Sequence, residues 1–143
     1  MLKAIVAKGH RVWLARLLIG PVLCWNLECA LALLWRPESY APGLELAGMS
    51  GVAMVRGIGL LFLMWNVPYA VAFWHPSRHR ISLLEALAMQ AIGFLGETAL
   101  WFSLPPGSAA LRSTTTRFIL FDGLGLALLF GATLLGRGRS STA

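Results

Sequence analysis

The residues that could do chemistry in this sequence are polar or charged side chains set inside long apolar stretches. A charged side chain at the centre of a membrane helix costs about 2.5 to 3.5 kcal/mol, so such side chains are expected to face a protein interior. We therefore predict an outward-opening polar pocket inside a bundle of helices. Seven side chains are its candidate ligand-binding residues: Glu28, Arg56, Asn66, Gln90, Glu97, Trp101 and Asp122.

The expected depth of the acidic residues favours a single site. At about 1.5 Å per residue, Glu28 lies roughly 3 Å from the middle of its span toward the outside, and Glu97 and Asp122 lie roughly 7 Å from the middle of theirs. On the third span, Gln90, Glu97 and Trp101 fall on one stripe of the helix. The three acids are therefore expected to converge on the outer half of the bundle.

Two interpretations of this polar set stay open. In the first, the acids and Arg56 bind a ligand, and aromatic side chains form the walls of the pocket: Trp25, Trp65, Tyr69 and Trp101. In the second, the acids pair with arginines such as Arg56 and Arg117 only to hold the four helices together, or to hold a partner subunit.

No nucleophile with an activating base stands out, so the catalytic residues stay unassigned and an enzyme is the less favoured class. Glu97 and Asp122 are the one candidate acid-base pair, which would suit a membrane isomerase. Cys24 and Cys29 lie about 140° apart around one expected helix and cannot form a disulfide there. No metal site is expected, because the two histidines of residues 75–80 lack a third ligand.

These side chains are carried by four apolar runs. Of the 143 residues, 57% are apolar and 13% are charged, a balance typical of membrane proteins. We predict an all-α polytopic membrane protein, a four-transmembrane-helix bundle in one domain, residues 1–143. The expected spans are 17–35, 57–74 with a helical lead from about residue 44, 81–104 and 118–136. Residues 1–16 are expected to form a surface helix and residues 108–117 a polar outer loop.

Positive charge sets the expected orientation. The turn at residues 75–80 is short and basic, which is typical of the cytoplasmic side. With this turn inside, eight lysines and arginines lie inside and four outside, so we expect both termini in the cytoplasm (N-in/C-in) of the bacterial inner (plasma) membrane. The net charge of +6 suits anionic lipid head groups. Because the arginines are scattered over several loops, nucleic-acid binding is not expected.

Three features together resemble the DoxX-like small four-helix membrane proteins. They are the Val-Arg-Gly-Ile-Gly run at residues 55–59, the His-Pro-Ser-Arg-His-Arg turn at residues 75–80, and Asp122 in the last span. The resemblance implies a four-helix bundle and, as in some members, an accessory role beside quinone-linked oxidoreductases. The sequence has no redox cysteine pair and no arrangement of haem ligands, so independent electron transfer is not expected.

The leading functional hypothesis is a non-enzymatic integral membrane protein. It would bind an amphipathic ligand, a quinone or a lipid, or act as an accessory subunit of a membrane complex. The alternatives are a proton-coupled small-molecule transporter that uses the intramembrane carboxylates, and the isomerase described above. No cofactor is evident beyond a bound quinone or lipid, and the expected partners are membrane lipids, a larger complex or further copies of the chain.

Overall fold

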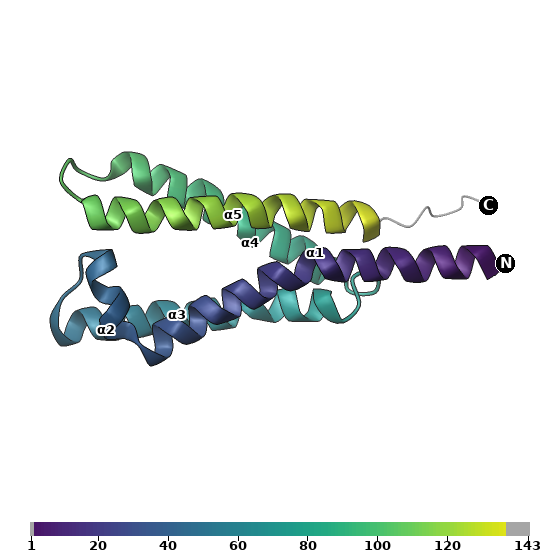
Figure 1. Cartoon of the computed structure of the whole chain (residues 1–143), viewed down its shortest axis with the longest axis horizontal. Helices are drawn as coiled ribbons and strands as arrows, with labels where there is room; N and C mark the ends of the chain where they lie inside the picture. Colours follow the sequence, from purple (N-terminus) through teal and green to yellow (C-terminus); the bar gives the residue numbers. More distant parts are fainter. Residues whose placement is uncertain (1, 137–143) are drawn as a thin grey trace.

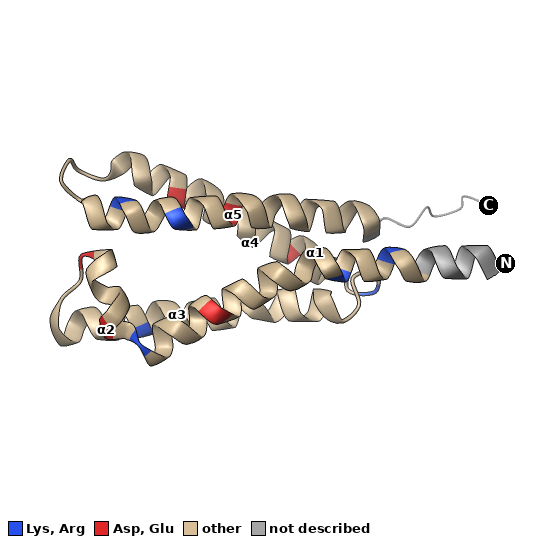
Figure 2. Cartoon of the chain, in the orientation of Figure 1, with Lys and Arg blue, Asp and Glu red and all other residues tan. Residues whose placement is uncertain are grey.

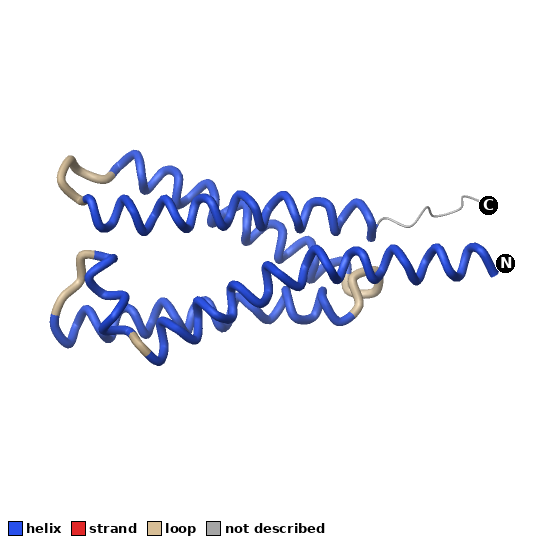
Figure 3. Tube along the Cα trace, viewed as in Figure 1, coloured by secondary structure: helices blue, strands red, loops and turns tan. Residues whose placement is uncertain are grey.

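The computed structural model describes residues 2–136, and their side chains from Gly9 to Leu135. The described part of the chain is helical throughout, with short turns and no strand (Figure 3). Its elements are α1 (Leu2–Trp35), α2 (Pro37–Tyr40), the 3-10 helix η1 (Ala41–Leu44), α3 (Gly48–Trp74), α4 (Arg80–Ser103) and α5 (Ala109–Gly136).

Four helical segments are long and apolar enough to cross a membrane: Gly9–Trp35, Gly48–Trp74, Arg80–Ser103 and Ala109–Leu135. The shortest of them has 24 residues, about 36 Å at 1.5 Å per residue, against a hydrocarbon layer of about 30 Å. The prediction of an all-α integral membrane protein with four spanning helices is therefore confirmed.

The four long helices form two antiparallel pairs, α1 with α3 and α4 with α5 (Figure 1). The pairs join because α1 also packs on α5, and α3 on α4. In Figure 1 the pairs lie close together toward the beginning of α1 and the end of α5, and they diverge toward the end that carries α2 and η1. We call the end of the bundle that carries α2 and η1 the α2 end. The opposite end, with the beginning of α1 and the end of α5, is the terminal end.

Packing is densest toward the terminal end. The main core contains Ile19 of α1, Leu83 of α4 and Leu129 of α5, all at most 2% exposed. The α2 end has a smaller core of Leu33, Ala41 and Val55, which holds η1 against α1 and α3. The two helix pairs thus pack directly on each other toward the terminal end, and at the α2 end η1 bridges them, because the Thr114 hydroxyl of α5 donates to the carbonyl oxygen of Gly43 at 2.7 Å.

Two contacts fix α1 against α3. Gly59 lets the helices approach closely, since a Cβ there would stand 3.0 Å from the carbonyl oxygen of Ala30. At the other end of α3, the Arg16 guanidinium donates to the carbonyl oxygens of Phe73, at 3.1 Å, and of Trp74. The last carbonyls of a helix have no partner within the helix, and a cation there also complements the helix dipole.

The structure corrects three expected boundaries. Residues 108–117 are not a loop, because the turn at residues 104–108 already reverses the chain and α5 begins at Ala109. Residues 1–16 do not form a separate surface helix, because α1 runs unbroken from Leu2 to Trp35. The lead into the second span is η1 followed by a turn, and α3 begins only at Gly48.

Because α5 begins earlier than predicted, Asp122 occupies a different place along its helix. Asp122 is residue 14 of the 28 in α5, so it lies at the middle of the helix and not in the outer half. In Figure 2 several acidic residues lie within the long helices, whereas much of the basic charge lies near their ends. Acidic side chains therefore lie within helices that are long and apolar enough to cross a membrane.

Candidate functional site

A chain of hydrogen bonds links three helices through the interior of the bundle. The Tyr69 hydroxyl of α3 donates to Gln90 Oε1 of α4 at 2.7 Å, and Gln90 Nε2 donates to Asp122 Oδ1 of α5 at 2.8 Å. Tyr69 and Gln90 are each 3% exposed. Hydrogen bonds in such a low-dielectric interior polarise one another and fix the orientation of every member.

The fourth helix contributes Asn26, whose side chain lies beside the Tyr69 hydroxyl. Two glycines make room for this arrangement. A Cβ at Gly93 would overlap the Asp122 carboxylate, and a Cβ at Gly125 would stand 2.5 Å from Gln90 Nε2. We call Asn26, Asn66, Tyr69, Gln90 and Asp122 the mid-bundle polar layer; all four spanning helices contribute to it.

Asn66 is the member of this layer with an unfilled hydrogen-bonding position. It is 4% exposed, and its Nδ2 donates to the carbonyl oxygen of Phe62 at 2.7 Å. Its Oδ1 has no donor, and within the described residues it is the one buried side-chain polar atom without a partner. Leaving a buried acceptor unpaired costs about 1 to 3 kcal/mol, so most are satisfied by protein, water or a ligand.

Asn66 faces the inside of the bundle. It lies on one stripe of α3 with Phe62, four residues before it, and Tyr69, three residues after it. Tyr69 reaches Gln90 of α4, and the Phe62 ring meets the edge of the Phe118 ring of α5 at 6.0 Å between centroids. Gly59, seven residues before Asn66 and about 20° from it around the helix, packs on α1, so Asn66 lies between the side of α3 that faces α1 and the side that faces α4 and α5.

Two opposite charges lie about one turn beyond the polar layer toward the α2 end. The rings of Trp25 and Phe121, with centroids 4.6 Å apart, align α1 with α5. From that contact, Glu28 is three residues further along α1 and Arg117 four residues back along α5, so both lie about 5 to 6 Å toward the α2 end. Glu28 on α1 and Arg117 on α5 are both exposed.

Glu97 of α4 lies at the same level. It follows Gly93, which touches Asp122, by one helical turn, and its charge is close enough to interact with that of Asp122. Glu97 is half-buried. We call Glu28, Glu97 and Arg117 the charged layer; within the described residues none of them, nor Asp122, is in an ion pair.

Aromatic residues lie close to the polar layer in the sequence, since Trp25 directly precedes Asn26 and Trp65 directly precedes Asn66. Besides the Trp25–Phe121 and Phe62–Phe118 contacts, the rings of Phe62 and Trp65 lie 5.4 Å apart. Trp25 and Trp65 are 52% and 48% exposed, so their faces are not closed off by neighbouring side chains. These five residues, the aromatic wall, come from α1, α3 and α5.

The structure brings together four of the seven predicted site residues. Gln90 and Asp122 are bonded directly, Asn66 shares their layer, and Glu97 lies one turn away. Glu28 reaches the same level from α1, but its side chain is exposed and does not point into the interior.

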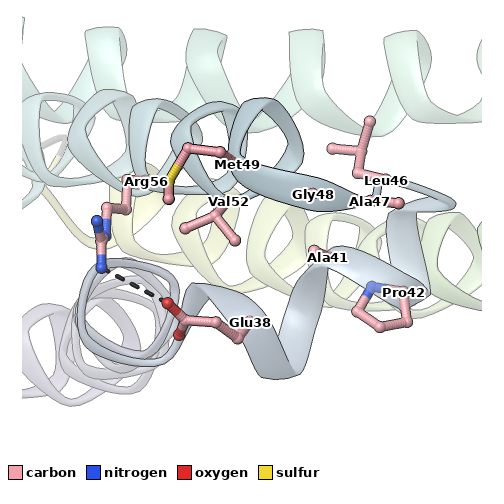
Figure 4. Close-up of a pocket in the computed structure, with 9 residues that line it drawn as sticks. All are labelled: Glu38, Ala41, Pro42, Leu46, Ala47, Gly48, Met49, Val52 and Arg56. Carbon is pink, nitrogen blue, oxygen red and sulfur yellow. Dashed lines mark ion pairs between the residues drawn. The ribbon is translucent and has the colours of Figure 1, made fainter.

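The remaining two predicted residues lie near the α2 end. Arg56 pairs with Glu38 of α2 at 3.7 Å on the rim of a surface cavity of about 550 Å³ (Figure 4). Trp101 donates from Nε1 to Thr116 Oγ1 at 3.1 Å and carries the Arg112 guanidinium over its ring at 4.8 Å. Both side chains thus connect elements at the ends of the helices.

Sequence reasoning missed two members of the site. Tyr69 was expected as an apolar wall, but its hydroxyl begins the hydrogen-bond chain. Its position three residues after Asn66, on the same stripe, was a signal that could have revealed this. Asn26 had a similar signal, since it lies next to Trp25 within an apolar run.

No family model, curated protein or solved structure matches this chain. In the described residues, no group of three or more histidine, cysteine, aspartate or glutamate side chains is placed to hold a metal ion.

Proposed function

We propose that this small integral membrane protein binds the polar head group of an amphipathic molecule in its mid-bundle polar layer. The observation that carries the proposal is the free Oδ1 of Asn66, a buried acceptor on α3 about one helical turn from Tyr69, which begins an ordered chain of hydrogen bonds. A ligand that donates to this oxygen removes the cost of leaving it unpaired. The apolar part of the same molecule would lie among the surrounding apolar and aromatic side chains.

The unfilled positions favour a head group that donates hydrogen bonds. Asn66 Oδ1 accepts, and so do the carboxylates of Asp122 and Glu97 when ionised. A quinone offers only carbonyl acceptors, whereas its reduced quinol form, or a lipid with a hydroxyl or amino group, offers donors. Among the expected ligands, the layer is therefore better matched to a quinol or a polar lipid than to an oxidised quinone.

An accessory role in a larger membrane assembly is part of the proposal. Glu28 is exposed on a span that lipid would otherwise surround, and a charge at such a place costs about 2.5 to 3.5 kcal/mol near the centre of a helix. A partner subunit or a second copy would cover it. This role agrees with the resemblance to the DoxX-like proteins, and the arginine distribution favours a bacterial inner membrane with both termini in the cytoplasm.

Native mass spectrometry of the protein, extracted gently from its own membrane, tests the proposal. We expect a stoichiometric small molecule on the wild type that is lost from Asn66→Leu. Thr98→Val is the control, because Thr98 Oγ1 bonds only to the Phe94 carbonyl of its own helix, at 2.6 Å. A wild-type protein that carries no small molecule, or an Asn66→Leu variant that keeps it, would contradict the proposal.

Proton-coupled transport is the second candidate. It is favoured by the two neighbouring carboxylates, Glu97 and Asp122, which lie within apolar helices and have no cationic partner in the described residues. In proteoliposomes, substrate-driven proton flux should collapse in Glu97→Gln and Asp122→Asn. Glu85→Gln is the control and should leave the flux unchanged, because Glu85 is exposed near the terminal end of α4, the helix that carries Glu97.

A further inference from the structure

We propose that two copies of this chain pair side by side in the membrane, so that Glu28 of each copy binds Arg117 of the other. The proposal rests on the assembly role within the proposed function and names a second copy as the partner that covers Glu28. Three features of the described residues lead to it: the depth of the two charges, their place beside one helix contact, and their opposite sign.

Glu28 and Arg117 lie well inside the apolar part of the bundle. Arg16 caps the last carbonyls of α3 at the terminal end. From Arg16 to the exposed Trp35, α1 rises about 28 Å, close to the hydrocarbon thickness of about 30 Å. On this scale Glu28 lies about 10 Å before Trp35, and Arg117 lies at the same level. A glutamate side chain is too short to reach the head groups from there, and a charge left in lipid is costly.

The two charges flank one contact between α1 and α5. The rings of Trp25 and Phe121, with centroids 4.6 Å apart, join these helices. Glu28 follows Trp25 by three residues and Arg117 precedes Phe121 by four, so each charge lies on the stripe of its helix that carries the touching ring. Since Trp25 is 52% exposed, the contact lies at the surface of the bundle. Its surroundings, with Glu28 on the α1 side and Arg117 on the α5 side, are called the α1–α5 face.

The rest of the α1–α5 face is apolar. Cys24 is exposed one turn before Glu28 on α1. On α5, Leu120 and Leu124 follow Arg117 along one stripe and are 68% and 54% exposed. Neither charge is in an ion pair within the described residues, although the two helices are neighbours. Each helix therefore presents one unpaired charge in an otherwise apolar surface.

A two-fold axis along the membrane normal would pair these charges twice. Rotation about such an axis keeps every residue at its own depth and brings the α1 side of the face in one copy against the α5 side in the other. With the axis between Glu28 and Arg117, each of them meets its opposite in the second copy. A different subunit would need one charge of each sign, at the same depth and in the reverse order, whereas a second copy has this arrangement by symmetry.

Charge reversal tests the pairing. The full chain, fused to a donor or an acceptor fluorescent protein, is reconstituted in phosphatidylcholine vesicles, and energy transfer is followed as the protein is diluted with lipid. We expect the wild type to dimerise. Glu28→Arg alone and Arg117→Glu alone should each raise the Kd of the dimer at least about a hundredfold, since like charges then meet at both contacts. Glu85→Arg, which reverses an exposed acid on α4, is the control and should dimerise like the wild type.

A mixture of the two reversed variants separates pairing between copies from pairing within one copy. In a dimer of Glu28→Arg with Arg117→Glu, opposite charges meet at both contacts, so energy transfer between the two variants should return to the wild-type level. Within either variant, residues 28 and 117 carry the same charge, so a pair inside one chain cannot explain this recovery. Glu28→Gln, which removes the charge without reversing it, should raise the Kd about tenfold and keeps the test valid where a reversed charge prevents insertion.

Three outcomes would overturn the proposal: a wild type that stays monomeric, a Glu28→Gln variant that dimerises like the wild type, or two inserted reversed variants that fail to pair with each other. If the wild type is monomeric while a small molecule is still lost from Asn66→Leu, the ligand site stands and only the second copy is wrong. If the mixture restores energy transfer while no small molecule is bound, the dimer stands and the proposed ligand site fails.

Discussion

Replacing Gly93 by alanine tests whether the structure places Asp122 correctly against α4. A Cβ at residue 93 would stand 3.0 Å from the Asp122 Cγ and would overlap one carboxylate oxygen. The carboxylate would have to move away from α4, and this movement would lengthen or break the 2.8 Å hydrogen bond that it receives from Gln90. The substitution therefore strains the packing and interrupts the hydrogen-bond chain at the same time.

The expected cost is the sum of these two effects. Overpacking a close-packed interior costs about 1 to 3 kcal/mol. The loss of an interhelical hydrogen bond in a membrane protein costs about 0.6 kcal/mol on average and up to about 1.7 kcal/mol. We therefore expect Gly93→Ala to lower the free energy of unfolding by about 2 to 5 kcal/mol.

Gly96→Ala is the matched control, because a Cβ at Gly96 has no atom within 4 Å. On helix propensity alone it should leave the free energy of unfolding unchanged or raise it by up to about 1 kcal/mol. Unfolding is followed by titrating the detergent-solubilised protein with sodium dodecyl sulfate. The cost of Gly93→Ala should largely disappear in an Asp122→Ala background, where no carboxylate obstructs the new methyl group. If Gly93→Ala behaves like Gly96→Ala, or costs the same without Asp122, the reasoning is refuted.

Three further predictions concern the contacts between helices. Gly59→Ala should cost about 1 to 3 kcal/mol in the same titration, because a Cβ there meets the backbone of α1 at 3.0 Å. Gly57→Ala is the control and should be neutral, because a Cβ at Gly57 has no atom within 4 Å. Equal effects of the two substitutions would contradict the close approach of α1 and α3. Arg16→Gln should cost about 1 to 2 kcal/mol, since the last two carbonyls of α3 lose their cationic donor. It should also speed amide hydrogen exchange in the turn after α3, and unchanged exchange would argue against this cap. Tyr69→Phe should cost about 1 to 2 kcal/mol by leaving a buried amide oxygen without a donor, and a neutral effect would place the hydroxyl outside the polar layer.

The spanning helices could be predicted from the sequence because the cost of leaving backbone groups unpaired in lipid forces long apolar runs into helices. The prediction that Gln90 and Asp122 face inward rested on the same kind of argument, since an exposed amide or carboxylate is costly there. The start of α5 was predicted wrongly. The threonines of residues 114–116 looked like a loop by composition, but Thr115 is buried and the Thr114 hydroxyl donates to the carbonyl of Gly43.

The partners of each polar residue were beyond prediction from sequence. Arg56 was expected in the central site, yet it pairs with Glu38, because α2 and η1 fold back beside the start of α3. Glu28 was expected to face inward with Glu97, but its side chain is exposed. Both outcomes depend on how the helices are turned and packed against one another, which the sequence does not specify.

The sequence by itself determined the number of spanning helices, the all-α class and the apolar runs in which polar side chains are buried. The helical period fixes which residues share a stripe, such as Phe62, Asn66 and Tyr69. It does not fix where that stripe points, because a helix that is apolar on every side has no polar face to turn toward water. Only the tertiary structure decided that α1 pairs with α3 and α4 with α5, and so which polar side chains meet.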